Sequence, residues 1–185
     1  STTADPARSA TYAAVECAKQ SGCIISFDPN LRLNLWPNSE SAKEQIAYGL
    51  SKCDVLKISD GEIEFMTGEK DVRRGVEVIT SRWNIPLVLA TMGADGSCAF
   101  YRGTSVYAQP FKMLNTVDTT GAGDTFGGCA LHFVLKYGLD SLNEERLIEM
   151  LTFANAAAAL ITTRKGALCV MPDVEEILSL ISSRR

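Results

Sequence analysis

Amphipathic segments and short apolar runs alternate along the first half of the chain. Helical spacing of apolar side chains is found at 7–20, 39–50 and 72–83, and continuous apolar runs typical of buried strands follow at 23–27, 54–59 and 86–91. The pattern predicts a helix start at Ser39, acting as the cap. Because strands that alternate with helices form parallel sheets, the sequence predicts an α/β fold with a doubly wound, mainly parallel sheet and flanking helices.

The second half of the chain has a different order of elements. Residues 97–101 and 105–109 flank Arg102-Gly103-Thr104 and predict an antiparallel hairpin, and helices are expected near 121–137, 144–163 and 173–181. Ligands of doubly wound sheets bind beyond the carboxyl ends of the strands. Asp28, Ser59 and Thr91 are all expected at that edge.

A seven-residue segment holds most of the functional information. Residues 118–124 read Asp-Thr-Thr-Gly-Ala-Gly-Asp and lead into an apolar helical run. The small residues Gly121, Ala122 and Gly123 let first-turn amides close on an anion such as a phosphate. Asp124 then provides a carboxylate suited to deprotonating a hydroxyl that attacks phosphorus. A capped buried helix is the alternative, but two aspartates framing two threonines favour phosphoryl transfer.

Residues 118–124 resemble the signature of the ribokinase-like, PfkB-type carbohydrate kinases, and residues 27–37 resemble the fructokinase branch. The resemblance covers essentially the whole chain. It implies that Asp124 is the general base, that Gly121, Ala122 and Gly123 form the anion hole, and that Mg²⁺-ATP is the donor. It also implies that 1–185 is the C-terminal nucleotide-binding part of one kinase domain whose N-terminal part and lid lie outside the chain, either by truncation or as a genuine fragment.

The resemblance also implies further nucleotide contacts. Thr91, Gly93 and Gly96 match the loop on the ATP side, where glycine allows close backbone approach. Asn155 would face the adenine end of the donor, although an asparagine that only packs the helix is the alternative. Ser59 replaces the asparagine of the family's Asn-x-x-Glu motif, whose glutamate, here Glu62, organises the water shell of Mg²⁺. A helix-start carboxylate is the competing interpretation of Glu62.

Asp28, Asn30 and Arg32 form a loop after a predicted strand, and an acid, an amide and a guanidinium together can grip hydroxyls and phosphates. The matching pattern occurs in fructokinases and in 2-keto-3-deoxygluconate kinases, so it does not choose between these substrates. A turn fixed by Pro29, with Arg32 solvated or ion-paired, is the alternative.

A monovalent cation such as K⁺ is a further implication of the resemblance. The family's cation loops, which bind largely through backbone carbonyls, match Asp118, Thr120, Ile161, Arg164 and Gly166. His132, the only histidine, is assigned no role.

The composition of the chain limits the classes of molecule that it is expected to bind. A net charge of −4 and a pI near 5.1 argue against nucleic-acid binding, and no apolar stretch has the length of a membrane span. Six cysteines without a Cys-x-x-Cys pair are expected to be reduced core residues, which favours the cytoplasm: Cys17, Cys23, Cys53, Cys98, Cys129 and Cys169. The predicted partners are a small-molecule sugar and ATP. Whether the full-length protein forms a homodimer is not decided by the sequence.

The sequence therefore predicts an ATP-dependent sugar kinase, fructokinase-like, that transfers the γ-phosphoryl group to a sugar hydroxyl with Asp124 as base. A 2-keto-3-deoxygluconate kinase and a non-catalytic nucleotide-binding fragment are the alternatives. The isolated fragment is expected to be inactive.

Overall fold

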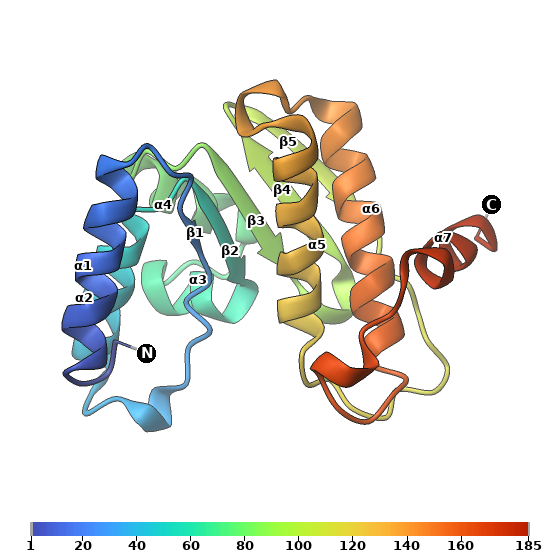
Figure 1. The fold of residues 1–185 in the computed structure, drawn as a ribbon, viewed down its shortest axis with the longest axis horizontal. Coiled ribbons are helices and arrows are strands. Elements are labelled where there is room, and N and C mark those ends of the chain that lie inside the picture. The colour runs from blue at the N-terminus through green and yellow to red at the C-terminus, as the bar shows by residue number, and fades with distance from the viewer. Residues whose placement is uncertain (1, 185) are drawn as a thin grey trace. The chain divides into compact units, whose positions relative to one another are not determined.

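The computed structural model describes residues 2–184 (Figure 1). These residues divide into two compact units, one ending at Leu89 and the other beginning at Ala90. The five strands follow one another in the order β1-β2-β3-β4-β5. The predicted α/β class is confirmed, while the assignment of the whole chain to one domain stays a prediction.

The first unit alternates helices and strands as the hydrophobic pattern predicts. Its elements are α1 (Ala7–Gln20), β1 (Ser26–Phe27), the 3₁₀ turn η1 (Leu33–Leu35), α2 (Ser39–Leu50), β2 (Val55–Ser59), α3 (Asp60–Thr67), α4 (Val72–Arg82) and, at the junction of the two units, β3 (Leu87–Thr91). β1 pairs with β2 in parallel, with Ser26 opposite Val55. α1 and α2 lie side by side (Figure 1), and the rings of Tyr12 and Tyr48 join them with centroids 4.0 Å apart.

The second unit contains the hairpin and the long helices. After the 3₁₀ turn η2 (Gly93–Asp95) come β4 (Ser97–Tyr101), β5 (Thr104–Ala108), α5 (Ala122–Tyr137), η3 (Leu139–Ser141), α6 (Glu144–Ile161), η4 (Leu168–Val170) and α7 (Val174–Ser182). β4 and β5 are antiparallel, which confirms the predicted hairpin. α5 and α6 run side by side (Figure 1), and Ile177 of α7 packs with Ala156 and Ala157 of α6.

Side-chain caps explain where several helices begin. The Asn38 side chain accepts a hydrogen bond from the Ser41 amide, so Asn38 caps α2 and Ser39 is its first helical residue. The prediction that Ser39 is the cap is therefore wrong by one position, because the amide oxygen of Asn38 reaches the first-turn N–H that needs an acceptor. Asn143 caps α6 in the same way, through the Arg146 amide.

The core of each unit is built from the expected apolar runs. Leu56 and Ile58 of β2 and Leu87 of β3 are fully buried in the first unit, and Leu147 and Leu151 of α6 are fully buried in the second. Fully burying a side chain of this size contributes roughly 1.5–3 kcal/mol relative to leaving it exposed.

The cysteines depart from the expected core positions. All six are free thiols, but only Cys53 is buried, and Cys17, Cys23 and Cys169 are exposed. Cys17 and Cys23 are exposed because α1 buries none of its residues and the chain from Ser21 to Ile24 lies at the surface. Within residues 2–184, no helix combines the length and the apolar character needed to span a membrane.

Candidate active site

The start of α5 has the conformation that an anion site needs. Gly121 precedes the helix at φ 80°, a left-handed conformation that favours glycine, and a Cβ there would meet the Ala167 side chain at 3.3 Å. The Ala122 amide donates to the Thr119 carbonyl at 3.2 Å. For the amides of Gly123 and Asp124, the structure of residues 2–184 records no acceptor. These two N–H groups at the positive end of the helix dipole are available to a phosphate oxygen.

A cavity of about 640 Å³ lies beside this helix start. Six residues predicted to contact the nucleotide or its phosphates line this cavity: Thr91, Gly93, Gly96, Ala122, Gly123 and Asn155. Asp124 follows Gly123 in the first turn of α5, and its side chain is exposed. The structure thus brings together the two loops that the sequence assigned to the donor.

The glycine turn before β4 depends on the absence of side chains. Gly96 has φ 89°, and a Cβ on it would lie 2.3 Å from the Ala108 carbonyl oxygen. Such a contact with backbone cannot be relieved by a side-chain rotation, so only glycine fits where the turn passes β5.

Asn155 connects three elements around the cavity. Its Oδ1 accepts from Ser97 Oγ at 2.9 Å, and its Nδ2 donates to the carbonyls of Ala108 and Gln109, both at 3.2 Å. Asn155 is 8% exposed. The side chain therefore fastens α6 to β4 and to the end of β5 while it lines the cavity, as the helix-packing alternative expects; contact with the donor stays a prediction.

The cavity beside α5 has a size that suits a nucleoside triphosphate. The cavity is large enough for a small organic ligand, since such sites measure roughly 300–1,000 Å³. Thr125 Oγ1, buried in the first turn of α5, has no hydrogen-bond partner within residues 2–184. Buried hydroxyls nearly always have a partner, but Thr125 is not among the residues that line the cavity beside α5.

The residues proposed for a monovalent cation lie on adjoining loops. Asp118 Oδ1 accepts from the Thr120 amide at 2.9 Å, and Oδ2 accepts from the Gly166 amide at 3.4 Å. Its hydrogen bonds with Thr120 hold the pKa of the Asp118 carboxyl below its usual value. The Ile161 carbonyl accepts from the Arg164 amide, and the Arg164 guanidinium forms an ion pair with Glu176.

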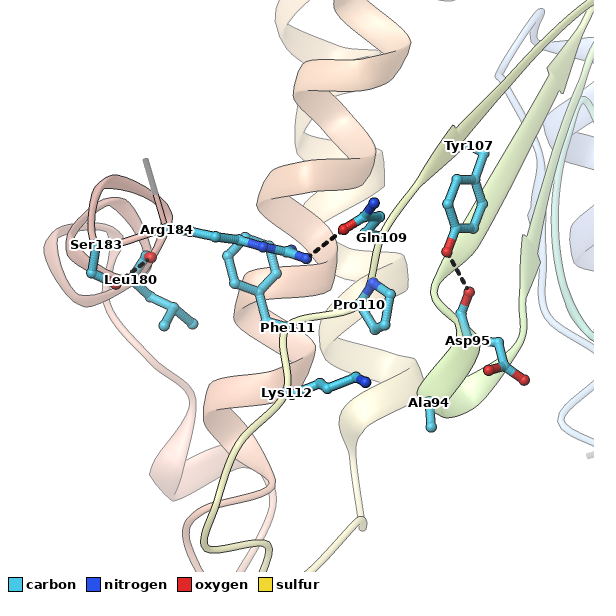
Figure 2. A pocket seen from close by; sticks show the side chains of 10 residues that line it. All are labelled: Ala94, Asp95, Tyr107, Gln109, Pro110, Phe111, Lys112, Leu180, Ser183 and Arg184. Atoms are coloured by element: carbon cyan, nitrogen blue, oxygen red, sulfur yellow. Dashed lines mark hydrogen bonds between the residues drawn. The ribbon is translucent and has the colours of Figure 1, made fainter.

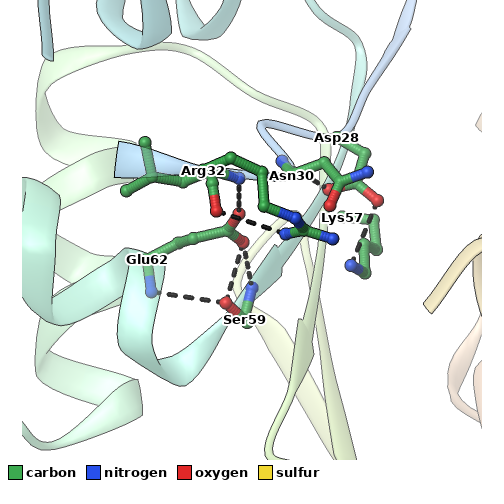
Figure 3. A network of polar contacts seen from close by, with 7 residues as sticks. Asp28, Asn30, Arg32, Lys57, Ser59 and Glu62 are labelled. Atoms are coloured by element: carbon green, nitrogen blue, oxygen red, sulfur yellow. Dashed lines mark hydrogen bonds and ion pairs between the residues drawn. The ribbon is translucent and has the colours of Figure 1, made fainter. Parts of the chain in front are cut away.

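In the first unit, the loop after β1 is part of a polar network (Figure 3). Asp28 Oδ2 lies 3.1 Å from Lys57 Nζ of β2, and Asp28 Oδ1 accepts from the Asn30 amide at 3.0 Å. Burial raises the pKa of the Asp28 carboxyl, and the charge of Lys57 opposes that rise. Arg32 is exposed, and its recorded hydrogen bond goes to the Leu31 carbonyl at 3.2 Å, as the alternative with a solvated Arg32 expects; a grip of this loop on hydroxyls or phosphate stays a prediction.

Glu62 closes a capping box at the start of α3. Its Oε2 accepts from the amide and the hydroxyl of Ser59, each at 2.8 Å, and its Oε1 accepts from the Leu31 amide at 2.7 Å. Glu62 therefore joins the end of β2 to the loop that contains Asn30 and Arg32. Ser59 and Glu62 have the Ser-x-x-Glu spacing of a capping box, which can be recognised in the sequence and would have predicted their contact.

Lys57 is a residue of this network that the sequence prediction missed. A lysine within an apolar strand is a signal in itself, because lysine is almost never fully buried without a partner. Its partner follows from the pairing of β1 with β2, in which Phe27 lies opposite Leu56, so Asp28 is the next position beside Lys57.

A second hollow of about 580 Å³ lies near the end of α7 (Figure 2). The Arg184 guanidinium stacks 4.6 Å from the centre of the Phe111 ring and donates to Gln109 Oε1 at 2.9 Å. None of the predicted site residues lines this hollow. The cavity beside α5 is therefore the candidate active site of the second unit.

Comparison with known proteins agrees with this geometry. Residues 2–173 match the model of the pfkB family carbohydrate kinases. Fructokinase-1 of Zea mays is 40% identical over 178 residues, which cover 96% of this chain and 55% of the maize protein. A fructokinase from Vibrio cholerae O395, crystallised with fructose, ADP and a calcium ion, superposes with a TM-score of 0.87 at 30% identity, over 97% of this chain and 57% of that one. A double mutant of a fructokinase from the same strain, crystallised with fructose, ADP and potassium, gives a TM-score of 0.85 at 29% identity, over 97% of this chain and 57% of the mutant.

The chain belongs to the pfkB family of carbohydrate kinases and has the ribokinase-like fold. It spans a little over half the length of the maize and Vibrio cholerae fructokinases that it matches.

Proposed function

We propose that this chain is the nucleotide-binding part of an ATP-dependent sugar kinase, fructokinase-like, that phosphorylates a sugar hydroxyl. The observation that carries the proposal is the start of α5. Among residues 2–184 the amides of Gly123 and Asp124 have no recorded acceptor, and Gly123 lines a cavity of about 640 Å³. Similarity to fructokinases crystallised with ADP and fructose supports the same substrates here.

Each group at the start of α5 has a proposed task. Bound Mg²⁺-ATP would supply the phosphoryl group and part of the charge neutralisation. The amides at Gly121, Ala122 and Gly123 were predicted to form the anion hole; because the Ala122 amide already donates to Thr119, those of Gly123 and Asp124 are the better placed donors. Asp124 accepts the proton of the attacking hydroxyl, so that the oxygen becomes nucleophilic as it approaches phosphorus.

The remaining predicted residues support this core. Thr91, Gly93, Gly96 and Asn155 form the wall for the donor, and Asp28, Asn30 and Arg32 grip the sugar or the transferred phosphate. Ser59 and Glu62 act near Mg²⁺ through water, and Glu62 is held in place by hydrogen bonds to both of its oxygens. We further propose that the loops of Asp118 and Gly166 bind K⁺ and that the enzyme acts in the cytoplasm, where cysteines stay reduced.

A substrate panel on the full-length protein tests the proposal. Purified protein is incubated with Mg²⁺-ATP and fructose, ribose, aminoimidazole riboside or 2-keto-3-deoxygluconate, and ADP release is measured. We expect fructose to give the highest kcat/KM. Preference for 2-keto-3-deoxygluconate would select the other sugar kinase, and ATP binding without release of ADP with any acceptor would select the non-catalytic alternative.

A further inference from the structure

Lys57 occupies an unusual place for a charged residue. It lies in the middle of β2, between Leu56 and Ile58, which are both fully buried, and its own side chain is only 13% exposed. The recorded partner of its ammonium group is the Asp28 carboxylate, 3.1 Å away. Burying an ammonium group costs free energy unless a partner compensates the charge, so this position has a reason beyond strand packing.

The loop that Lys57 contacts has a fixed backbone. Asn30 adopts φ 45°, a left-handed conformation that is uncommon for residues other than glycine. It is held on one side by the Asp28 carboxylate, which accepts from the Asn30 amide, and on the other by Glu62, which accepts from the Leu31 amide. Asp28 can serve this turn because Lys57 fixes its second oxygen.

The network contains two carboxylates, Asp28 and Glu62, and two cationic side chains, and the recorded ion pair among them is that of Asp28 with Lys57. Asp28 is compensated by Lys57, and the carboxylate of Glu62 accepts three hydrogen bonds from Leu31 and Ser59. Arg32 has an exposed side chain that folds back over the network (Figure 3), and its recorded hydrogen bond goes to the Leu31 carbonyl at 3.2 Å. Among residues 2–184 the structure records no ion pair for Arg32.

We propose that Lys57 is a positioning residue that holds the Asp28 carboxylate away from Arg32, so that the Arg32 guanidinium stays available to an anionic oxygen of phosphate. Asp28 is four residues before Arg32 in the same loop and is the nearest acid in sequence that could neutralise it. Guanidinium and carboxylate form strong, often bidentate pairs, so an Asp28 released from Lys57 competes with phosphate for Arg32. The inference rests on the proposed function, in which this anion is the transferred phosphoryl group.

Phosphate binding at Arg32 tests the proposal without using turnover. In the full-length protein, the arginine Nε–Hε signals are followed by NMR during titration with inorganic phosphate, and the Arg32 signal is assigned with Arg32→Lys. We expect a saturable shift in the wild type, an affinity about tenfold weaker in Lys57→Met, and retention of most of the affinity in Lys57→Arg. Lys52→Met removes another lysine–carboxylate pair of the same unit, with Glu16, and should leave phosphate affinity unchanged.

The double variant separates positioning from direct contact. In Lys57→Met/Asp28→Asn no carboxylate remains to capture Arg32, so phosphate affinity should return to that of Asp28→Asn alone. This comparison also holds if Lys57→Met by itself does not fold. A double variant as weak as Lys57→Met, or weaker than Asp28→Asn, would mean that Lys57 touches the anion or only stabilises the strand, and would overturn the proposal.

Two other results would also overturn it: unchanged affinity in Lys57→Met, and no shift of Arg32 in the wild type. The proposed kinase function fails by a different measurement, the release of ADP with a sugar acceptor. A protein with sugar-dependent turnover but no phosphate response at Arg32 would retain the function and lose this role of Lys57.

Discussion

Asp124 is the residue with the most specific proposed role. Asp124→Asn in the full-length protein should lower kcat by roughly 10²- to 10⁴-fold, because an amide keeps the shape of the side chain but cannot accept the hydroxyl proton. Affinity for ATP should change little. Steady-state kinetics with the preferred sugar and a nucleotide-binding titration measure the two effects separately.

Asp140→Asn is a matched control for this change. Asp140 is an exposed aspartate whose partner is Arg102 on the surface of the second unit, so its loss should leave kcat within twofold or so, as for ordinary surface substitutions. Near-normal turnover in Asp124→Asn would remove the base from the mechanism.

The cysteines give a prediction that depends on pKa. Burial raises the pKa of the Cys53 thiol to about 12, so at pH 8 it carries almost no reactive thiolate. Iodoacetamide should therefore alkylate Cys17, Cys23 and Cys169 in the folded chain while Cys53 stays unmodified until denaturant is added. Peptide mass spectrometry before and after unfolding measures which cysteines are alkylated. Alkylation of Cys53 in the folded chain would show that its surroundings open readily.

Single residues differ in how far sequence alone reveals them. The position of Gly121, Gly123 and Asp124 at a helix start could be predicted because they lie in one contiguous motif, while their roles stay predictions. Lys57 could not, because its task depends on which residue of β1 lies beside it in the sheet. The bonds of Asn155 to Ser97 and Ala108 were hidden for the same reason: they join positions 58 and 47 residues apart.

The element that matters most to the site is α5, and its glycines differ in purpose. Gly121→Ala puts a side chain at φ 80°, against Ala167, and should destabilise the chain by roughly 1–2 kcal/mol. Gly128 lies inside the helix, is exposed, and has open space around its Cβ position, so Gly128→Ala should stabilise the chain by about 0.5–1 kcal/mol. Chemical unfolding of the two variants should give shifts of opposite sign; a stabilised Gly121→Ala would mean that the left-handed cap is not needed.

The bounds of most elements were predictable, those of β2 and β3 to within one residue, whereas the bounds of β1 were not. The bounds of α1 and α2 agree with the prediction, and α4 ends within one residue of it, because apolar periodicity over three or more turns is a strong signal. The apolar run 23–27 predicted a five-residue strand, whereas β1 is only Ser26–Phe27. A short apolar run indicates that a segment can form a strand. How many of its residues pair depends on the neighbouring strand, and the run itself holds no information about that strand.

The whole molecule raises the question of what this chain can do alone. It covers 55% of the length of the maize fructokinase, and β1 is one of the two edge strands of the sheet among the described residues. Large apolar side chains are also open to solvent, with Leu114 fully exposed and Leu135 and Leu168 each 83% exposed. Open sheet edges and apolar surface promote association, so these features predict a chain that tends to self-associate.

We therefore expect the 185-residue chain to bind nucleotide weakly and to phosphorylate no sugar. The start of α5 and its cavity are present, but an acceptor hydroxyl must be held in line with the phosphoryl group, and positioning of this kind contributes roughly 7–11 kcal/mol to catalysis. The chain covers 55% of the maize fructokinase, and we predict that most of the sugar-binding wall and the lid belong to the part that it does not cover. Light scattering during size-exclusion chromatography and fructose-dependent ADP release, with the full-length protein as positive control, measure association and activity. A monodisperse chain that releases ADP with fructose would show that the acceptor site lies within residues 1–185.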